Sequence, residues 1–175
     1  MSVEQHRAQS PERVNCFVLT VSDTRTLATE TSGRTIAGML EDSGHFVLGR
    51  QVVRDEPQEV AAAIREEIGR HRVHVIITTG GTGIASRDST YEAITGLFDK
   101  RIDGFGELFR MLSYKEIGAA AMLSRATAGI VHGCAIFMLP GSPAAVQLGM
   151  QRLILPEIGH VVRELTKDDA KLSHL

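Results

Sequence analysis

Apolar runs of strand length alternate along this chain with segments that have helical periodicity. Residues 14–21 and 73–79 are mostly apolar, which is typical of strands buried on both faces of a sheet. Residues 46–53 form a further strand candidate. Each of the three runs is followed by polar or glycine-rich residues, which predict a loop at the end of each strand.

Amphipathic helices are predicted between these strands. In residues 32–43 the apolar side chains fall at helical spacing, and Gly44 is a good helix stop. Pro57 suits the first turn of a second helix. The inner stripe of that second helix comprises Val60, Ile64 and Ile68.

The C-terminal half continues the alternation. A helix is predicted to start near Asp88 or Ser89, where Ser89 and Glu92 fit a capping box. Residues 104–117 are predicted to be helical, and residues 129–139 to form one or two strands with a turn at His132-Gly133. Ser142 and Pro143 suit the N-cap and first turn of a final helix. Pro156 is expected to kink or break that helix.

Alternating strands and helices favour an α/β fold, with a mostly parallel sheet covered by helices on both faces. The chain has 175 residues, which suits a single domain with a sizeable core. We expect this domain to span residues 13–166, between a flexible N-terminal tail (1–12) and a polar C-terminal tail (167–175).

Composition narrows the classes of function. The formal net charge of −2 gives no global basic field, so no nucleic-acid partner is expected. No signal peptide or membrane-length apolar run is visible, which predicts a cytoplasmic protein without a membrane partner. Cys16 and Cys134 lie in apolar runs and are expected to be buried, reduced thiols.

Polar residues gather where the predicted strands end. In a mostly parallel sheet, ligands bind at the carboxyl ends of the strands. In this chain those ends carry four segments, namely Ser22-Asp23-Thr24, Arg54-Asp55-Glu56, Thr79-Gly80-Gly81-Thr82-Gly83 and Pro140-Gly141-Ser142-Pro143. The sequence therefore predicts a ligand site at this edge of the sheet.

The glycine-rich loop 79–83 suits an anionic ligand. Its glycines let backbone N–H groups approach a phosphate, and the helix that follows adds positive partial charge. A tight turn without a ligand explains the loop equally well. No Gly-Lys-Ser/Thr follows, so the loop is not a P-loop. It nearly matches the dinucleotide fingerprint, with Ser86 in place of glycine or alanine, but the match is weak because the loop follows the third strand and no clear strand ends in the required acid.

Two acids near this loop indicate a divalent cation. Asp55 ends one strand and Asp88 follows the loop, and carboxylates beside a phosphate would repel it unless a cation bridged both. We therefore expect Mg²⁺ between Asp55 and Asp88, although each acid could instead begin a helix. Arg87, Arg110 and Arg125 could neutralise phosphates, although each could equally be a solvated surface arginine.

The ordered motifs of the chain resemble the molybdopterin adenylyltransferase family of molybdenum cofactor biosynthesis, which includes the MoaB and MogA proteins. The resemblance covers residues 14 to about 165 and is carried by the strand-end segments above together with three others. These are Arg87-Asp88, Gly104-Phe105-Gly106-Glu107-Leu108-Phe109-Arg110 and Leu123-Ser124-Arg125-Ala126. The segment Leu112-Ser113-Tyr114-Lys115-Glu116-Ile117-Gly118 is more similar to the MoaB branch.

This resemblance implies a three-layer Rossmann-like fold and a homotrimer or homohexamer. It implies transfer of AMP from Mg-ATP to the phosphate of molybdopterin, with pyrophosphate as the second product. By the same resemblance Asp55 and Asp88 are the catalytic acids and Mg²⁺ ligands. The implied ligand-binding residues are Ser22, Asp23, Thr24, Gly80, Gly81, Thr82, Gly83, Arg110, Ser124, Pro140, Gly141 and Ser142.

Three other readings remain open at this point. Tyr91 stands where many relatives have proline, and some members of the MoaB branch lack the two acids, which this chain keeps. A non-catalytic molybdopterin-binding protein of the same pathway, which could contact other proteins of that pathway, is therefore the main alternative. A nucleotide-dependent oxidoreductase and a structural oligomer without a small ligand are the others.

Overall fold

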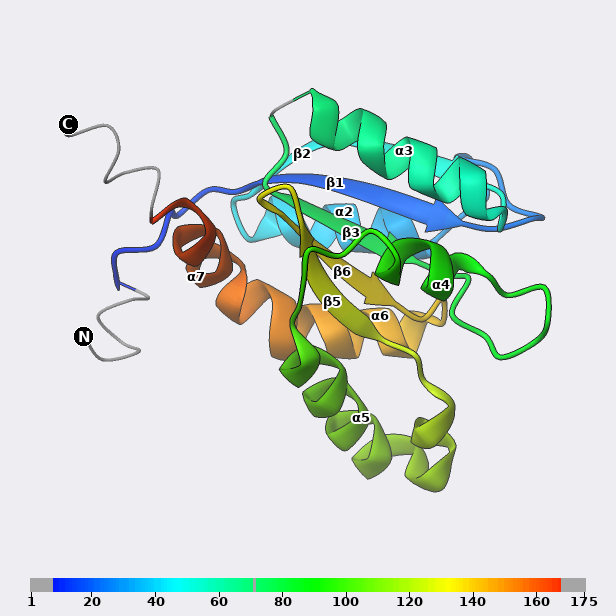
Figure 1. Ribbon diagram of the computed structural model, residues 1–175. Coiled ribbons are helices and arrows are strands. Elements are labelled where there is room, and N and C mark those ends of the chain that lie inside the picture. Colours follow the sequence, from blue (N-terminus) through cyan, green and yellow to red (C-terminus); the bar gives the residue numbers. More distant parts are fainter. Residues whose placement is uncertain (1–7, 71, 168–175) are drawn as a thin grey trace.

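The computed structural model describes residues 8–70 and 72–167, whose helices and strands are arranged around a six-stranded sheet (Figure 1). The strand order is β2-β1-β3-β6-β5-β4. The first four strands in this order are parallel to one another, whereas β5 runs antiparallel to β6 and β4 runs antiparallel to β5 at one edge. The expected α/β class with a mostly parallel sheet is confirmed. The strands are β1 (Asn15–Val21), β2 (Phe46–Val53), β3 (Val75–Thr79), β4 (Lys100–Arg101), β5 (Thr127–Val131) and β6 (Cys134–Leu139).

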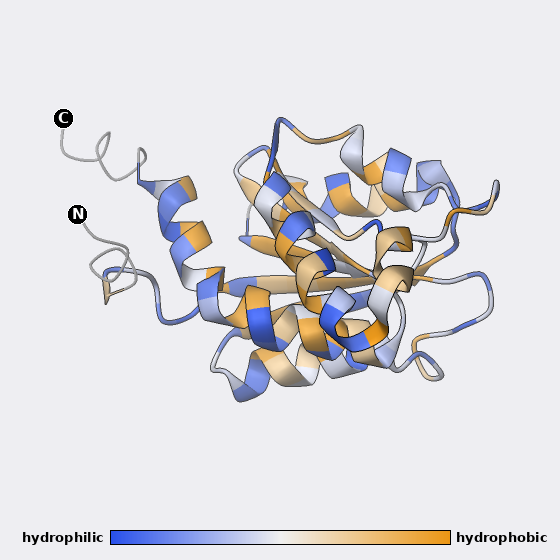
Figure 2. Cartoon of the chain, turned by 90° about the horizontal axis from the view of Figure 1, so that it is seen from below, coloured by the Kyte–Doolittle hydropathy of each residue, from blue (hydrophilic) through white to orange (hydrophobic). Residues whose placement is uncertain are grey.

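Helices cover both faces of the sheet. The α-helices are α2 (Ser32–Asp42), α3 (Pro57–Gly69), α4 (Thr90–Thr95), α5 (Asp103–Ile117), α6 (Pro143–Gly149) and α7 (Leu155–Thr166). A 3₁₀ segment, η1 (Gly118–Leu123), follows α5, and a π-helical segment, η2 (Met150–Ile154), joins α6 to α7. Figure 2 shows apolar and polar segments alternating along the helices, as amphipathic helices require.

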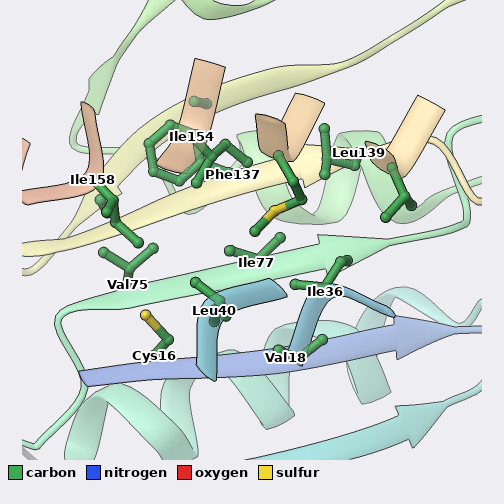
Figure 3. Close-up of a cluster of buried hydrophobic side chains, with 14 of the residues drawn as sticks. Cys16, Val18, Ile36, Leu40, Val75, Ile77, Phe137, Leu139, Ile154 and Ile158 are labelled. Carbon is green, nitrogen blue, oxygen red and sulfur yellow. The ribbon is translucent and has the colours of Figure 1, made fainter. Parts of the chain in front are cut away.

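The core has two parts, one on each face of the sheet. On the first face, Ile36 and Leu40 of α2 pack with Val18, Ile77 and Phe137 of the strands (Figure 3). Residues of α5, α6 and α7 complete this larger cluster. On the second face, α3 and α4 cover the sheet through Val60, Ile64 and Ile94. This arrangement leaves the carboxyl ends of β1, β3 and β6 free to carry loops.

One local prediction was wrong. Ser89 is the N-cap of α4, but its side chain makes no capping bond, because its hydroxyl donates to Asp55 Oδ1 at 3.4 Å. The predicted interruption of the last helix was confirmed, since a π-helical turn separates α6 from α7 and Pro156 lies in the first turn of α7. The two-residue strand β4 was not predicted.

Other local predictions were confirmed. Gly44 follows α2 with a positive φ of 85°. Ser142 caps α6 by accepting the Ala145 N–H at 3.3 Å, and Pro143 begins that helix. His132 and Gly133 turn between β5 and β6, both with positive φ. Both cysteines are buried and free, and burial raises the pKa of each thiol to about 12.

The predicted tails lie mostly outside the described residues, namely at positions 1–7 and 168–175. Within the described part of the N-terminal segment, Gln9 Oε1 accepts a hydrogen bond from Arg163 of α7 at 2.8 Å. In the described part of the chain, no helix is long and apolar enough to span a bilayer.

Candidate functional site

Three parallel strands deliver their following loops to one edge of the sheet. β1 and β6 both pair in parallel with β3, so their carboxyl ends lie side by side (Figure 1). A cavity of about 340 Å³ opens there. Its lining includes Ser22 after β1, Gly80 after β3 and Gly141 after β6. Three of the four segments that the sequence predicted to meet thus line one cavity, whereas the side chains of Asp55 and Asp88 are not part of its lining.

The glycine-rich loop passes so close to its neighbours that side chains would not fit. Gly80 and Gly81 have positive φ values of 93° and 65°. A Cβ atom on Gly80 would lie 2.2 Å from the carbonyl oxygen of Val21. A Cβ on Gly81 would lie 2.3 Å from Thr90 Oγ1, and one on Gly83 would lie 2.2 Å from Asp88 Oδ2. The loop therefore requires glycine both for its backbone conformation and for its packing.

Asp55 is a buried carboxylate behind this loop. Its side chain follows β2 and is held by α4, since Oδ1 accepts from Thr90 Oγ1 at 2.7 Å and from the Ser89 N–H at 3.3 Å. Asp55 is only 8% exposed, so these bonds satisfy a charge that would otherwise be costly to bury. The other oxygen, Oδ2, accepts no hydrogen bond from the described residues and lies toward Gly81.

Asp88 occupies the other end of the same loop. Its Oδ2 accepts the Ala85 N–H at 2.9 Å, and its own N–H donates to the Ala85 carbonyl at 3.0 Å. Oδ1 has no hydrogen-bond donor in the described part of the chain. Asp88 and Asp55 approach Gly83 and Gly81 respectively, and two residues of chain span at most about 7 Å. The two acids therefore flank one short stretch of loop.

This donor set suits Mg²⁺ held together with a phosphate ligand. Each acid keeps one oxygen that accepts no hydrogen bond from residues 8–70 and 72–167, and Mg²⁺ prefers one or two carboxylates completed by substrate phosphates and water. Within the described ranges there is no group of three or more His, Cys, Asp or Glu side chains that could hold a metal alone. A cation here would therefore take ligands from the substrate.

The segment after β1 is tied to the same loop by charge. Asp23 Oδ1 accepts the Asp55 N–H at 3.1 Å, and Asp23 Oδ2 accepts from Arg87 Nε at 3.0 Å. Arg87 also reaches Glu56 at 3.2 Å. The Arg87 guanidinium, followed by the Asp55 N–H, holds the pKa of the Asp23 carboxyl below its usual range. Arg87 therefore joins the β1, β2 and β3 loops.

The remaining residues of the first strand-end segment shape its turn. Ser22 Oγ accepts the N–H groups of Thr24 and Arg25 at 3.3 and 3.1 Å. Thr24 is exposed. Ser22 therefore contributes to the turn as well as to the cavity wall.

The loop after β6 closes the cavity from the opposite side. The carbonyl of Pro140 accepts from Thr79 Oγ1 at 3.2 Å, and the carbonyl of Gly141 accepts from Ser32 Oγ at 2.8 Å. A Cβ on Gly141 would lie 3.4 Å from the Cα of Gly80, so the two loops are in contact. Ser142 uses its hydroxyl to cap α6.

Arg110 and Ser124 lie together, but away from this cavity. Arg110 projects from α5 and donates to the carbonyls of Ser124 and Ala126 at 3.4 and 3.2 Å. Ser124 Oγ accepts the Ala126 N–H at 3.4 Å. Arg110 lines a separate, largely apolar depression with Tyr114 and Met122. In this structure both residues shape the chain before β5.

The guanidinium of Arg125 contacts the glycine-rich loop and the residues that follow it. It donates to the carbonyls of Thr82, Gly83 and Asp88 and pairs with Glu92. With Asp88 and Glu92 it lines a second cavity of about 330 Å³ on the outer side of the loop. The sequence indicated only a possible phosphate ligand here, because no spacing rule links position 125 to carbonyls more than 35 residues earlier.

Known proteins share this fold and sequence along nearly the whole chain. The family described as a probable molybdopterin binding domain matches residues 17–160. Molybdenum cofactor biosynthesis protein B of Halalkalibacterium halodurans is 52% identical over 169 residues, which cover 96% of this chain and 99% of that protein. Its counterpart in Bacillus subtilis is 48% identical over 169 residues, with the same coverage.

Solved structures give the same result. A crystal structure of a molybdenum cofactor biosynthesis protein B matches with a TM-score of 0.87 and 46% identity, covering 91% of this chain and 99% of that one. The tungsten cofactor synthesizing protein MoaB of Pyrococcus furiosus matches with a TM-score of 0.82 and 39% identity, covering 89% and 99%. The chain is therefore a molybdenum cofactor biosynthesis protein and belongs to the MoaB branch of the MoaB/MogA family.

Proposed function

We propose that this protein transfers AMP from Mg-ATP to the phosphate of molybdopterin, giving adenylylated molybdopterin and pyrophosphate. The observation that carries this proposal is the pair of acids, Asp55 and Asp88, which flank the glycine-rich loop and each keep one carboxylate oxygen with no donor among the described residues. The family relationship supplies molybdopterin as the ligand, since the matching family model describes a molybdopterin binding domain.

The proposed reaction needs little general acid–base catalysis from the protein. A phosphate monoester has a second pKa near 6, so its oxygen is largely ionised at neutral pH. That oxygen forms a bond to the α-phosphorus of ATP, while the bond from the α-phosphorus to the bridging oxygen breaks and pyrophosphate leaves with that electron pair. Catalysis then depends mainly on positioning and on stabilising negative charge.

Different residues would bind the metal ion, orient the phosphates and bound the ligand. Asp55 and Asp88 would hold Mg²⁺, which when bound supplies positive charge beside the triphosphate. The backbone N–H groups of the loop from Gly80 to Gly83 would orient the phosphates without obstruction from side chains. Gly141 and Ser22 would bound the ligand on the β6 and β1 sides, where they line the cavity.

Anaerobic incubation with molybdopterin and Mg-ATP tests the proposal, with pyrophosphate and adenylylated molybdopterin as the readouts. We expect Asp88→Asn to lower turnover by about 10²-fold or more. The fold should be kept, because an asparagine oxygen can still accept the Ala85 N–H. Asp42→Asn, at the exposed end of α2, is the matched control and should retain wild-type turnover.

The two possible failures are distinguishable. Near-normal turnover of Asp88→Asn would refute the role of the acid. Molybdopterin binding by the wild-type protein without release of pyrophosphate would favour the non-catalytic binding protein instead.

We also propose that the chain forms a homotrimer or homohexamer and acts in the cytoplasm, where ATP is available. The support for assembly is an exposed apolar face on α5 and η1, where Met122 is 78% and Tyr114 is 63% exposed. The double variant Tyr114→Glu/Met122→Glu should lower the mass measured by sedimentation. Leu48→Glu on β2 is the control and should leave the mass unchanged. An unchanged mass in the double variant would exclude the face on α5 and η1 as the assembly interface.

A further inference from the structure

The guanidinium of Arg125 binds both ends of the segment from Thr82 to Asp88, which continues the glycine-rich loop toward α4. Arg125 Nε donates to the Thr82 carbonyl at 3.1 Å, and Nη2 donates to the carbonyls of Gly83 and Asp88. Residues 84–87 between these anchor points are exposed, and Figure 1 shows this loop extending away from the sheet before α4. Arg125 thus fastens the base of the loop while its tip projects into solvent.

The guanidinium is itself fixed by its surroundings. Its centre lies 4.7 Å from the centroid of the Tyr91 ring, and Nη1 pairs with Glu92. The Arg125 side chain is only 22% exposed. Because the planar face stacks and the edges donate, the side chain has a single well-defined arrangement.

Holding a carbonyl also orients the N–H of the same peptide unit, because the unit is planar and trans. Arg125 binds the Asp88 carbonyl on one edge of such a unit. The N–H on the other edge belongs to Ser89 and donates to Asp55 Oδ1 at 3.3 Å. Arg125 and Asp55 therefore form hydrogen bonds to opposite edges of the peptide unit between Asp88 and Ser89.

We propose that Arg125 is a positioning residue for the adenylyl-transfer site. It acts through the backbone of the glycine-rich loop, setting the direction of the loop N–H groups and the placement of Asp88 relative to Asp55. The catalytic role of Arg125 rests on the proposed function. The hydrogen bonds from Arg125 to the loop carbonyls, called the clamp below, are a property of the fold. Arg101 provides a matched comparison, because it contacts the same Tyr91 through the phenol oxygen at 3.2 Å but bonds to no loop carbonyl.

A spin label on the loop tests the clamp without any substrate. Ile84 is 70% exposed, and Cys16 and Cys134 are buried with thiol pKa values raised to about 12, so Ile84→Cys supplies the reactive thiol. Arg125→Gln should sharpen the electron paramagnetic resonance spectrum of this label, because the loop gains mobility. Arg101→Gln should leave the spectrum unchanged. Equal spectra for Arg125→Gln and its parent would overturn the clamp.

Kinetics on unlabelled protein test the catalytic consequence. We expect Arg125→Gln to lower kcat by about 10²-fold, and Arg125→Lys to recover little, because an ammonium cannot serve separated carbonyls as a fork does. Added guanidinium ion should restore part of the turnover of Arg125→Ala. Arg101→Gln should stay near wild type, and an equal loss in this variant, or full activity of Arg125→Gln, would refute the positioning role.

The two proposals fail in different ways. If the wild-type protein shows no adenylyl transfer while the spin label still responds to Arg125→Gln, the proposed function fails and the clamp stands. If wild type is active and the label is indifferent to Arg125, the function stands and the clamp fails.

Discussion

Two threonines beside the glycine-rich loop should respond in opposite ways to the same substitution. Thr90 is fully buried, and its hydroxyl donates to Asp55 Oδ1 at 2.7 Å. Thr78 is equally buried, but its hydroxyl has no hydrogen-bond partner within the described part of the chain. Valine replaces the hydroxyl with a methyl group of similar size. The sign of the effect therefore reports on hydrogen bonding rather than on volume.

The expected magnitudes follow from the partners. A hydrogen bond to a charged group contributes about 1.5–3 kcal/mol, so Thr90→Val should lower the free energy of unfolding by about 2 kcal/mol. An unpaired buried hydroxyl costs about 1–3 kcal/mol in mutational data, so Thr78→Val should raise that free energy by about 1 kcal/mol. For a domain of this length, Tm should fall by roughly 4–8 °C and rise by roughly 2–4 °C respectively.

Urea and thermal unfolding followed by far-ultraviolet circular dichroism measure both changes, since the chain contains no tryptophan for fluorescence. The urea m-value should stay constant, because neither variant changes the surface exposed on unfolding. A similar loss of stability in both variants would refute the reasoning. It would mean that the fit of the new methyl group, not the polar partner, decides the energy at these positions.

Two further predictions use other parts of the fold. Burial lowers the pKa of His45 in the folded protein, and its Nδ1 accepts the Val14 N–H at 3.3 Å. The contribution of neutral His45 to the free energy of unfolding should therefore be complete above pH 6.5 and be lost as the pH falls through the lowered pKa of the folded state. Unfolding free energies at several pH values should show this slope in wild type and not in His45→Ala. Gly81→Ala should destabilise the protein by at least about 1 kcal/mol, because φ is positive and the new Cβ meets Thr90. Gly38→Ala in α2 meets nothing within 4 Å and should instead stabilise by about 0.5–1 kcal/mol, and both are read from urea midpoints.

The sequence predicted the sheet well because buried parallel strands have a distinctive apolar pattern. β1 and β3 are such runs, and the polar residues after them marked the edge where the cavity opens. β4 could not be predicted in the same way, since two residues carry no periodicity. Its place is set by pairing with β5, which is a tertiary contact.

The site was predictable as a set of loops, but not as a set of contacts. The capping box at Ser89 and Glu92 satisfied the local pattern, yet both side chains have distant partners in Asp55 and Arg125. A charged or buried partner contributes more than a local cap, so tertiary structure overrides the motif. Such partners are invisible to any rule based on sequence spacing.

The segment from Ser124 to Ala126 connects the two functional regions proposed for this protein. From one side, Arg110 of α5 holds the carbonyls of Ser124 and Ala126. From the other side, Arg125 reaches the glycine-rich loop. Because α5 also carries the exposed apolar face, Arg110 connects that face to the segment from which Arg125 reaches the loop. The family motif Leu-Ser-Arg-Ala therefore has a physical role in this chain even though Arg110 and Ser124 lie outside the cavity, since it joins the helix that presents the apolar face to the loop that presents Asp88.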